Sequence, residues 1–79
     1  MIILTDVLAN IAKAIVDNPD KVEVTESKKE NGDIVLTLKV APEDMGMVIG
    51  RHGRIAKSIR LIMKTAANSL GEKVTVDIE

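Results

Sequence analysis

The apolar residues change their spacing along this chain, and these changes constrain its fold more than any other feature. Near the N-terminus they recur at intervals of three and four residues, which places them on one stripe of a helix with Thr5 as its N-cap. The helix is expected to end near Asn18, because Pro19 disfavours helical geometry in the residue before it. The stripe consists of Leu4, Val7, Leu8, Ile11 and Ile15.

Three later runs have the period of two that is typical of β-strands. The first two runs are separated by Asn31-Gly32, a pair that indicates a β-hairpin. The third run closes the sequence after Gly71. The alternating apolar positions are Val22 and Val24, then Ile34, Leu36, Leu38 and Val40, and finally Val74, Val76 and Ile78.

The helical period returns between the second and third runs. Pro42 suits a first helical turn, and Glu43-Asp44 suit the positive end of a helix dipole, so a short helix is expected over 42–49. A longer helix is expected over 54–70, with Gly71 as its C-terminal stop. Its predicted inward stripe is Ile55, Ile59, Ile62, Met63, Ala66 and Leu70.

This order of elements predicts an α+β fold, α-β-β-α-α-β, with three helices packed on one face of a three-stranded mixed sheet. The two helices between the second and third strands form a crossover that allows those strands to be parallel. The length of 79 residues fits one domain spanning 1–79. A core of this size leaves no room for a deep substrate cavity, so an enzyme is not expected.

The residue types also limit the chemistry of the chain. It has no cysteine and one histidine, so we expect no disulfide, zinc knuckle or other metal site, and no constellation indicates catalysis, a cofactor or a small-molecule substrate. The apolar segment 1–4 is too short for a signal peptide or a membrane span. We therefore expect a soluble protein of the reducing cytoplasm.

The formal net charge of −1 hides an uneven distribution. Residues 1–50 contain nine acids and five bases, whereas residues 51–79 contain six bases and three acids. No acid lies between Asp44 and Glu72. The C-terminal part therefore carries the local field that attracts a polyanion.

A glycine-bounded turn, Gly50-Arg51-His52-Gly53, separates the two helices of the basic part. Glycines allow a sharp turn and let a phosphate approach the main chain, and the next helix is expected to present unpaired amides and the positive end of its dipole. Arg51 and Arg54 can make charge-assisted hydrogen bonds to phosphate oxygens. On the helix that follows, a basic flank is expected from Lys57, Arg60 and Lys64.

The run Ile49-Gly50-Arg51-His52-Gly53 resembles the Ile-Gly-x-x-Gly signature of KH domains, in which this loop clamps four nucleotides. The order of elements resembles the type II arrangement of that fold, so the resemblance covers the whole chain. Among KH proteins the chain is similar to the stand-alone bacterial KhpA family in its length, its Asp17-Asn18-Pro19-Asp20 turn and its run over 53–60. Ala56 departs from the branched apolar residue of many KH domains.

The resemblance implies cytoplasmic binding of single-stranded RNA, in post-transcriptional regulation or as an RNA chaperone-like partner, and pairing with a Jag-type KH protein. On this interpretation the phosphates are held by Gly50, Arg51, His52 and Gly53. The groove and its edge would be formed by Ile49, Arg54, Ile55 and Lys57, with Ile49 and Ile55 offering apolar surface to bases.

Leu61 falls about 120° outside the inward stripe of the long helix, so it is expected to be exposed and to anchor a homodimer by a symmetric helix-to-helix contact. Two other functions are consistent with the residues: a protein-interaction adaptor that dimerises through the long helix with little affinity for RNA, and a DNA-binding helix-turn-helix module. The absence of Phe, Tyr and Trp excludes the stacking platforms of RRM and OB folds. Neither glycine precedes the Lys-Ser/Thr pair of a nucleotide-binding P-loop.

Overall fold

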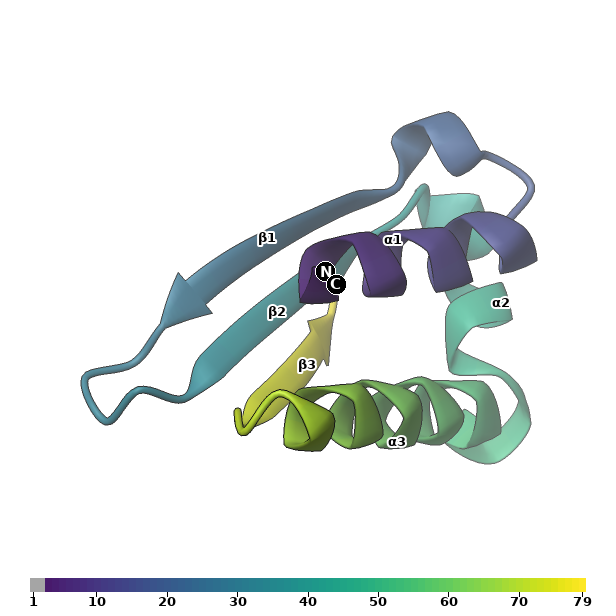
Figure 1. The fold of residues 1–79 in the computed structure, drawn as a ribbon. Helices are drawn as coiled ribbons and strands as arrows, with labels where there is room; N and C mark the ends of the chain where they lie inside the picture. The colour runs from purple at the N-terminus through teal and green to yellow at the C-terminus, as the bar shows by residue number, and fades with distance from the viewer. Residues whose placement is uncertain (1–2) are drawn as a thin grey trace.

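The computed structural model describes residues 3–79 and confirms the expected order of elements (Figure 1). Single 3₁₀ turns join several of them at Pro19–Lys21, Pro42–Asp44 and Arg51–Gly53. The helices and strands are α1 (Leu4–Ile15), β1 (Glu23–Lys28), β2 (Ile34–Lys39), α2 (Met45–Ile49), α3 (Arg54–Ser69) and β3 (Val74–Ile78).

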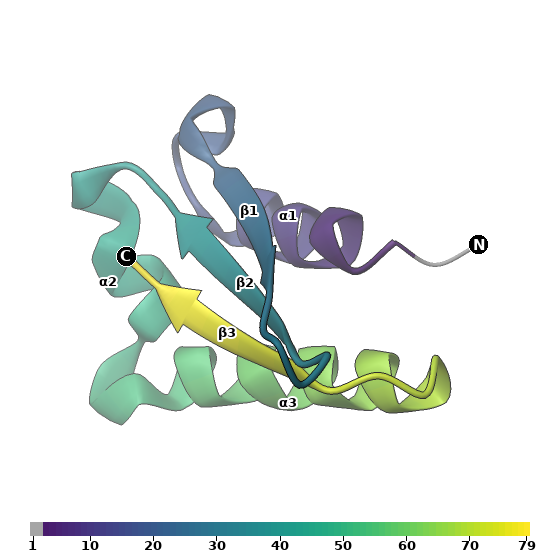
Figure 2. The same cartoon turned by 90° about the vertical axis from the view of Figure 1, so that its left-hand side faces the viewer.

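The three strands form a mixed sheet in the order β1-β2-β3. The hairpin strands β1 and β2 are antiparallel, with Val24 opposite Leu38. β2 and β3 are parallel, with Leu36 opposite Val76, because the chain crosses over through α2 and α3 between them. The three helices lie on one side of this sheet (Figures 1 and 2). The α+β fold predicted from the spacing is confirmed.

The core lies between the sheet and the helices, where every second residue of β2 points inward. Leu36 and Leu38 are fully buried, and so are Leu8 and Ala12 of α1 and Met63 of α3. The remaining members of the buried cluster are Leu4, Val16, Ile34, Val40, Val48, Ile59, Ala67 and Val76.

The predicted N-cap of α1, Thr5, is wrong by two residues. The helix begins at Leu4, and its N-cap is Ile3, whose backbone is extended and whose side chain makes no capping hydrogen bond. Thr5 lies inside the first turn. Leu4 is buried one turn before Leu8, so packing of this residue against the core places the helix start before the threonine.

The predicted inward stripe of α3 is also partly wrong. Ile62 and Leu70 are 47% and 44% exposed, whereas Ala56 and Ala67, which were not predicted to face the core, are buried. The helix is turned so that these small residues lie near its buried face, which allows it to approach the rest of the core closely. The predicted C-terminal stop is confirmed, since the Gly71 and Glu72 amides donate to Asn68 O at 3.0 Å and Ala67 O at 2.9 Å.

None of the helices within residues 3–79 combines the length and the apolar character that crossing a membrane requires.

Candidate nucleic-acid interface

The Gly-x-x-Gly turn lies at the surface, at the N-terminal end of α3 (Figure 2). The Gly50 amide ends α2 by donating to Gly46 O at 2.9 Å. One 3₁₀ turn follows, in which the Gly53 amide donates to Gly50 O at 3.2 Å, and α3 then begins at Arg54. Arg51 and His52 are exposed. The turn between two helices that the sequence predicts is therefore present and accessible.

Gly50 is required by its conformation and by its neighbour. Its φ of 74° and ψ of 175° lie in a region that residues with a side chain essentially never adopt. A Cβ atom at this position would lie 2.7 Å from Cγ1 of Ile55. Ile55 is half-buried and packs against the first glycine, so it fixes the shape of the turn.

Gly53 differs from Gly50 because the space beside it is empty. Its backbone is left-handed, with φ 72° and ψ 17°, and a Cβ atom there would meet no heavy atom of residues 3–79 within 4 Å. His52 shares this left-handed conformation, with φ 59°. The second glycine therefore leaves the main chain open to a bulky group such as a phosphate.

The expectation that the turn presents unpaired amides is only partly correct. The Gly53 amide is engaged with Gly50 O, and the Arg54 amide donates to Arg51 O. The 3₁₀ turn satisfies these donors internally. Attraction for an anion at the turn consequently depends more on the cationic side chains than the sequence suggested.

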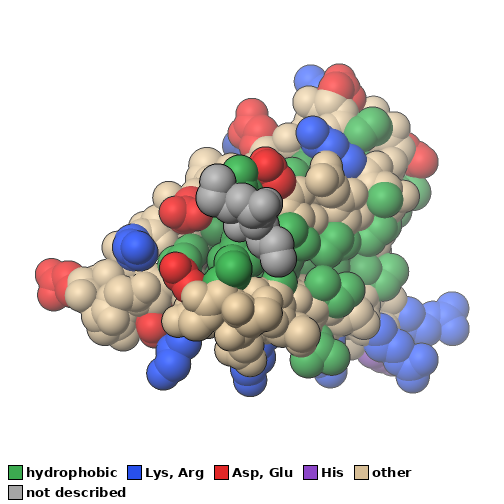
Figure 3. Space-filling model, in the orientation of Figure 1, with side chains coloured by type: hydrophobic (Ala, Val, Ile, Leu, Met, Phe, Trp, Pro, Cys, Tyr) green, Lys and Arg blue, Asp and Glu red, His purple; other side chains and the backbone are tan. Residues whose placement is uncertain are grey.

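Those side chains gather around the turn. Arg51, Arg54 and Lys57 are exposed, and so is His52. Lys and Arg side chains are concentrated along the lower edge of the molecule, where α3 lies, and near the turn (Figure 3). Because the sequence has no acid from Met45 to Gly71, the cations of α3 have no acidic neighbour on their own helix.

Arg60 lies between α3 and β3, and its position was not predicted. Its Nε donates to Val76 O at 3.3 Å. The Lys73 carbonyl and the Glu79 amide bond to β2, so by alternation the polar main-chain groups of Val74, Val76 and Ile78 point away from β2. Arg60 thus crosses to the free edge of β3, on the basic flank of α3 that includes Lys57 and Lys64.

The predicted site residues divide into three locations. Ile49, which is 40% exposed, lies at the end of α2 beside the turn with the loop cations. Ile55 is about 140° around α3 from Arg60, so it supports the turn from the flank opposite β3. Leu61 is 64% exposed in the middle of α3, as its helical position predicts.

A second unpredicted feature holds α2 in place. The Asp44 side chain is fully buried, and its Oδ2 accepts hydrogen bonds from the main-chain and side-chain nitrogens of Asn18 at 2.9 and 3.1 Å. The sequence suggested only that Asp44 favours a helix dipole. Its pairing connects the end of α1 to the start of the helix that leads into the turn.

Among solved structures, the fold is similar to part of Era. The TM-score is 0.64 against an Aquifex aeolicus Era variant bound to GDP.AlF4−, with 14% identity over 95% of this chain and 29% of that chain. Era in complex with MgGDPNP and a segment of 16S ribosomal RNA gives the same TM-score and identity, with 95% and 28% covered. This chain spans less than a third of either Era chain, and at this identity the similarity shows the fold alone.

Similarity in sequence is closer to curated proteins named RNA-binding protein KhpA. The one from Clostridium acetobutylicum is 52% identical over 75 residues, covering 95% of this chain and 99% of that protein. Those of Clostridium perfringens and Aquifex aeolicus are 54% and 41% identical, covering 86% and 95% of this chain and 89% and 94% of theirs. A family model described as KhpA/KhpB, KH domain matches residues 5–78. Fold, turn and sequence agree, and the chain belongs to the KhpA/KhpB family of KH domains.

Proposed function

We propose that this protein binds single-stranded RNA as one KH domain, with the turn from Gly50 to Gly53 receiving the sugar-phosphate backbone. The observation that carries this proposal is the empty space beside Gly53, next to exposed cations in an acid-free segment. The name RNA-binding protein KhpA, borne by relatives that match nearly the whole chain, supports the same function.

The residues of the turn have distinct roles in this proposal. Arg51 and Arg54 pair with phosphate oxygens, and His52 borders the same path. Gly53 allows the strand to approach, and Gly50 holds the bend against Ile55. Lys57 continues the positive field along α3.

Bases are contacted on the apolar side of the turn. Ile49 offers its exposed side chain to the bases, and the half-buried Ile55 offers the part of its side chain that the turn does not cover. With no Phe, Tyr or Trp in the chain, base contacts are aliphatic, and affinity comes mainly from the backbone. Such a protein acts without catalysing a reaction, as a cytoplasmic post-transcriptional regulator or RNA chaperone-like partner.

Leu61 gives the protein a second surface. Its side chain is 64% exposed on α3, and Ile62 beside it is 47% exposed, so α3 presents apolar area suited to another helix. In this proposal two copies pair through α3 with Leu61 near the two-fold axis, and a Jag-type KH protein uses the same helix in a mixed dimer. If RNA affinity were negligible, these residues would favour the adaptor function instead.

The test uses two substitutions at Gly53, because its surroundings accept a side chain. Aspartate and asparagine have nearly the same shape and both tolerate a left-handed backbone, but only aspartate adds negative charge. Fluorescence anisotropy with a labelled single-stranded RNA should show an affinity at least tenfold lower for Gly53→Asp than for Gly53→Asn. Equal affinities of the two variants and the parent would favour a protein-interaction adaptor. A preference for duplex DNA over single-stranded RNA would favour a DNA-binding helix-turn-helix module.

A further inference from the structure

A hollow of about 440 Å³ lies between the C-terminal half of α3 and the start of β3. Its lining residues place it toward the opposite end of α3 from the Gly-x-x-Gly turn. Its lining side chains are mostly hydrogen-bond donors: two ammonium groups, a carboxamide and a hydroxyl, with a single carboxylate. The lining residues are Asp33, Lys64, Asn68, Lys73, Val74 and Thr75.

This set of groups suits a phosphate next to a ribose. Lys64 belongs to α3 and Lys73 to the segment just before β3, and both are exposed enough to reach a ligand in the hollow. Asn68 and Thr75 can bond to sugar hydroxyls or phosphate oxygens. The hollow has a net positive lining, which distinguishes it from the neighbouring one.

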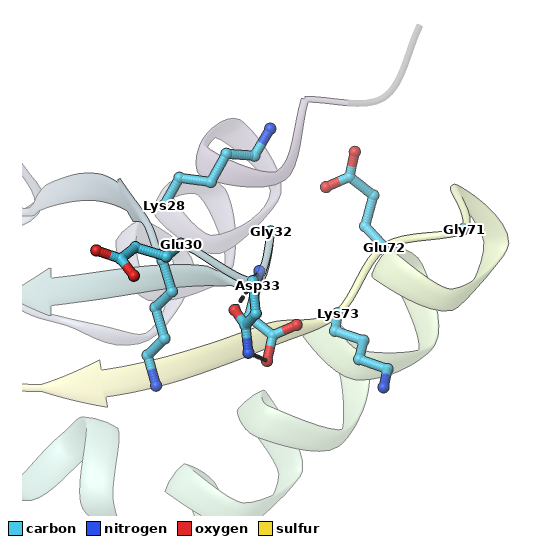
Figure 4. A pocket seen from close by; sticks show the side chains of 9 residues that line it. Lys28, Glu30, Gly32, Asp33, Gly71, Glu72 and Lys73 are labelled. Atoms are coloured by element: carbon cyan, nitrogen blue, oxygen red, sulfur yellow. Dashed lines mark hydrogen bonds between the residues drawn. The ribbon is translucent and has the colours of Figure 1, made fainter.

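The neighbouring hollow, of about 560 Å³, lies between the β1–β2 loop and the turn after α3 (Figure 4). Its lining contains three lysines and three acids, so it has no net charge to attract an anion. In Figure 4 the Lys73 side chain extends away from Lys28 and Glu72. This orientation agrees with its place beside Lys64 in the smaller hollow.

Cations connect the turn to this smaller hollow. Lys57, Arg60 and Lys64 follow each other at intervals of three and four residues on the flank of α3 that faces β3. Lys64 is eleven residues after Gly53, which corresponds to about 16 Å along a helix. A stacked single strand covers that distance with about five nucleotides at about 3.4 Å each.

We infer that the hollow between α3 and β3 is a second RNA-contact site, which takes a phosphate and ribose of the strand already held at the turn. This inference rests on the proposed function and extends it. The turn of a KH domain holds four nucleotides, so the footprint grows to about nine. Short oligomers occupy the turn alone, and longer ones also reach Lys64 and Lys73.

Asp33 limits the strength of this second site. Its carboxylate Oδ2 accepts a hydrogen bond from Asn31 Nδ2 at 3.3 Å, and its own amide donates to Asn31 Oδ1 at 3.0 Å. The side chain is therefore held at the β1–β2 loop, on the wall of the hollow. Its negative charge repels a phosphate. A protein with the neutral asparagine at position 33 should therefore bind the longer strand more tightly.

The experiment compares oligouridines of four and ten nucleotides by fluorescence anisotropy at several salt concentrations. In a Lys64→Ala/Lys73→Ala variant the affinity for the ten-nucleotide strand should fall about tenfold, and its log-log salt slope by about 1.4, because two phosphates lose their cations. Affinity for the four-nucleotide strand should not change. A Lys13→Ala/Lys21→Ala variant, which removes two exposed lysines outside the hollow, is the matched control.

The Asp33→Asn variant should bind more tightly than the parent, and a variant that fails to fold cannot give this result. The substitution should raise affinity for the ten-nucleotide strand several-fold and leave the four-nucleotide strand unaffected. If the parent binds both lengths with one affinity and one salt slope, the second site is refuted while the turn remains supported. If the lysine pair and its control reduce binding equally, the effect is general charge and the second site is again refuted. A parent that binds neither strand overturns the proposed function itself.

Discussion

The carboxylate of Asp44 and the amide groups of Asn18 form a contact between residues 26 positions apart, with Oδ2 accepting at 2.9 Å from the main-chain nitrogen and 3.1 Å from the side chain. Asp44 is fully buried, and its Oδ1 has no hydrogen-bond partner among residues 3–79. The contact joins the segment after α1 to the start of α2, five residues before the Gly-x-x-Gly turn begins.

Removal of this carboxylate should destabilise the fold. In Asp44→Ala the half-buried Asn18 loses the acceptor of its main-chain amide and a cavity is left at the buried position 44, so the free energy of unfolding should fall by about 2–3 kcal/mol, as measured by urea unfolding. Glu43→Ala is the matched control, because its carboxylate accepts from Asn18 Nδ2 at 3.2 Å in an exposed place and should change the stability by less than about 1 kcal/mol. Similar losses in the two variants would show that the buried pairing is not the cause.

Much of the fold could be predicted because it depends on local spacing. The order of helices and strands, the hairpin at Asn31-Gly32 and the glycine turn all follow from residues close together in the sequence. The Asn18–Asp44 pairing and the Arg60–Val76 bond could not be predicted, since they depend on how distant segments meet. The rotation of α3 is a similar case. Whether its alanines or its larger residues face the core is decided only when the helix packs against the sheet.

The two glycines of the turn should respond differently to alanine. Gly50→Ala places Cβ 2.7 Å from Ile55 Cγ1 in a backbone region reserved for glycine, so we expect a loss of about 3 kcal/mol or more. Gly53→Ala meets no atom within 4 Å in the part of the chain that the structure describes, and it retains only the strain of a left-handed residue, about 1 kcal/mol. Urea unfolding of both variants measures the contrast.

A double-mutant cycle tests whether Ile55 causes the difference. Truncation to Ile55→Ala removes the Cγ1 atom that a Cβ at Gly50 would meet, so the Gly50→Ala/Ile55→Ala variant should be more stable than the sum of the single losses predicts, by about 1 kcal/mol. Additive losses would mean that backbone strain alone explains the requirement for Gly50. The corresponding cycle with Gly53→Ala should show no coupling.

Arg60 should contribute to RNA binding more than to stability. Its bond to Val76 O is 3.3 Å long and partly exposed, so Arg60→Gln should change the free energy of unfolding by less than about 1 kcal/mol. The same change removes a cation from the flank between the turn and the second site, and the salt slope of binding to a ten-nucleotide RNA should fall by about 0.7. Arg60→Lys keeps the charge and should keep the slope. An unchanged slope in Arg60→Gln would exclude Arg60 from phosphate contact.

Pairing through α3 and binding to RNA should respond to salt in opposite directions. Lys57 and Lys64 lie four and three residues from Leu61 on the exposed side of α3, so a symmetric contact centred on Leu61 brings cations of two copies together. Their repulsion is screened as the Debye length shortens from about 10 Å at 0.1 M salt to about 3 Å at 1 M. Added salt should therefore strengthen the dimer, measured by light scattering over a concentration series, while it weakens RNA binding.

Substitutions at Leu61 separate the apolar contact from this repulsion. Leu61→Lys removes the apolar side chain and adds a third cation, so the variant should remain a monomer at every salt concentration, whereas Leu61→Met keeps the apolar surface and should dimerise like the parent. Both variants should fold normally, because the side chain is 64% exposed. A Leu61→Lys variant with the same mass as a dimeric parent would place the dimer contact elsewhere. A parent that is monomeric at high salt and high concentration would remove homodimerisation through α3 altogether.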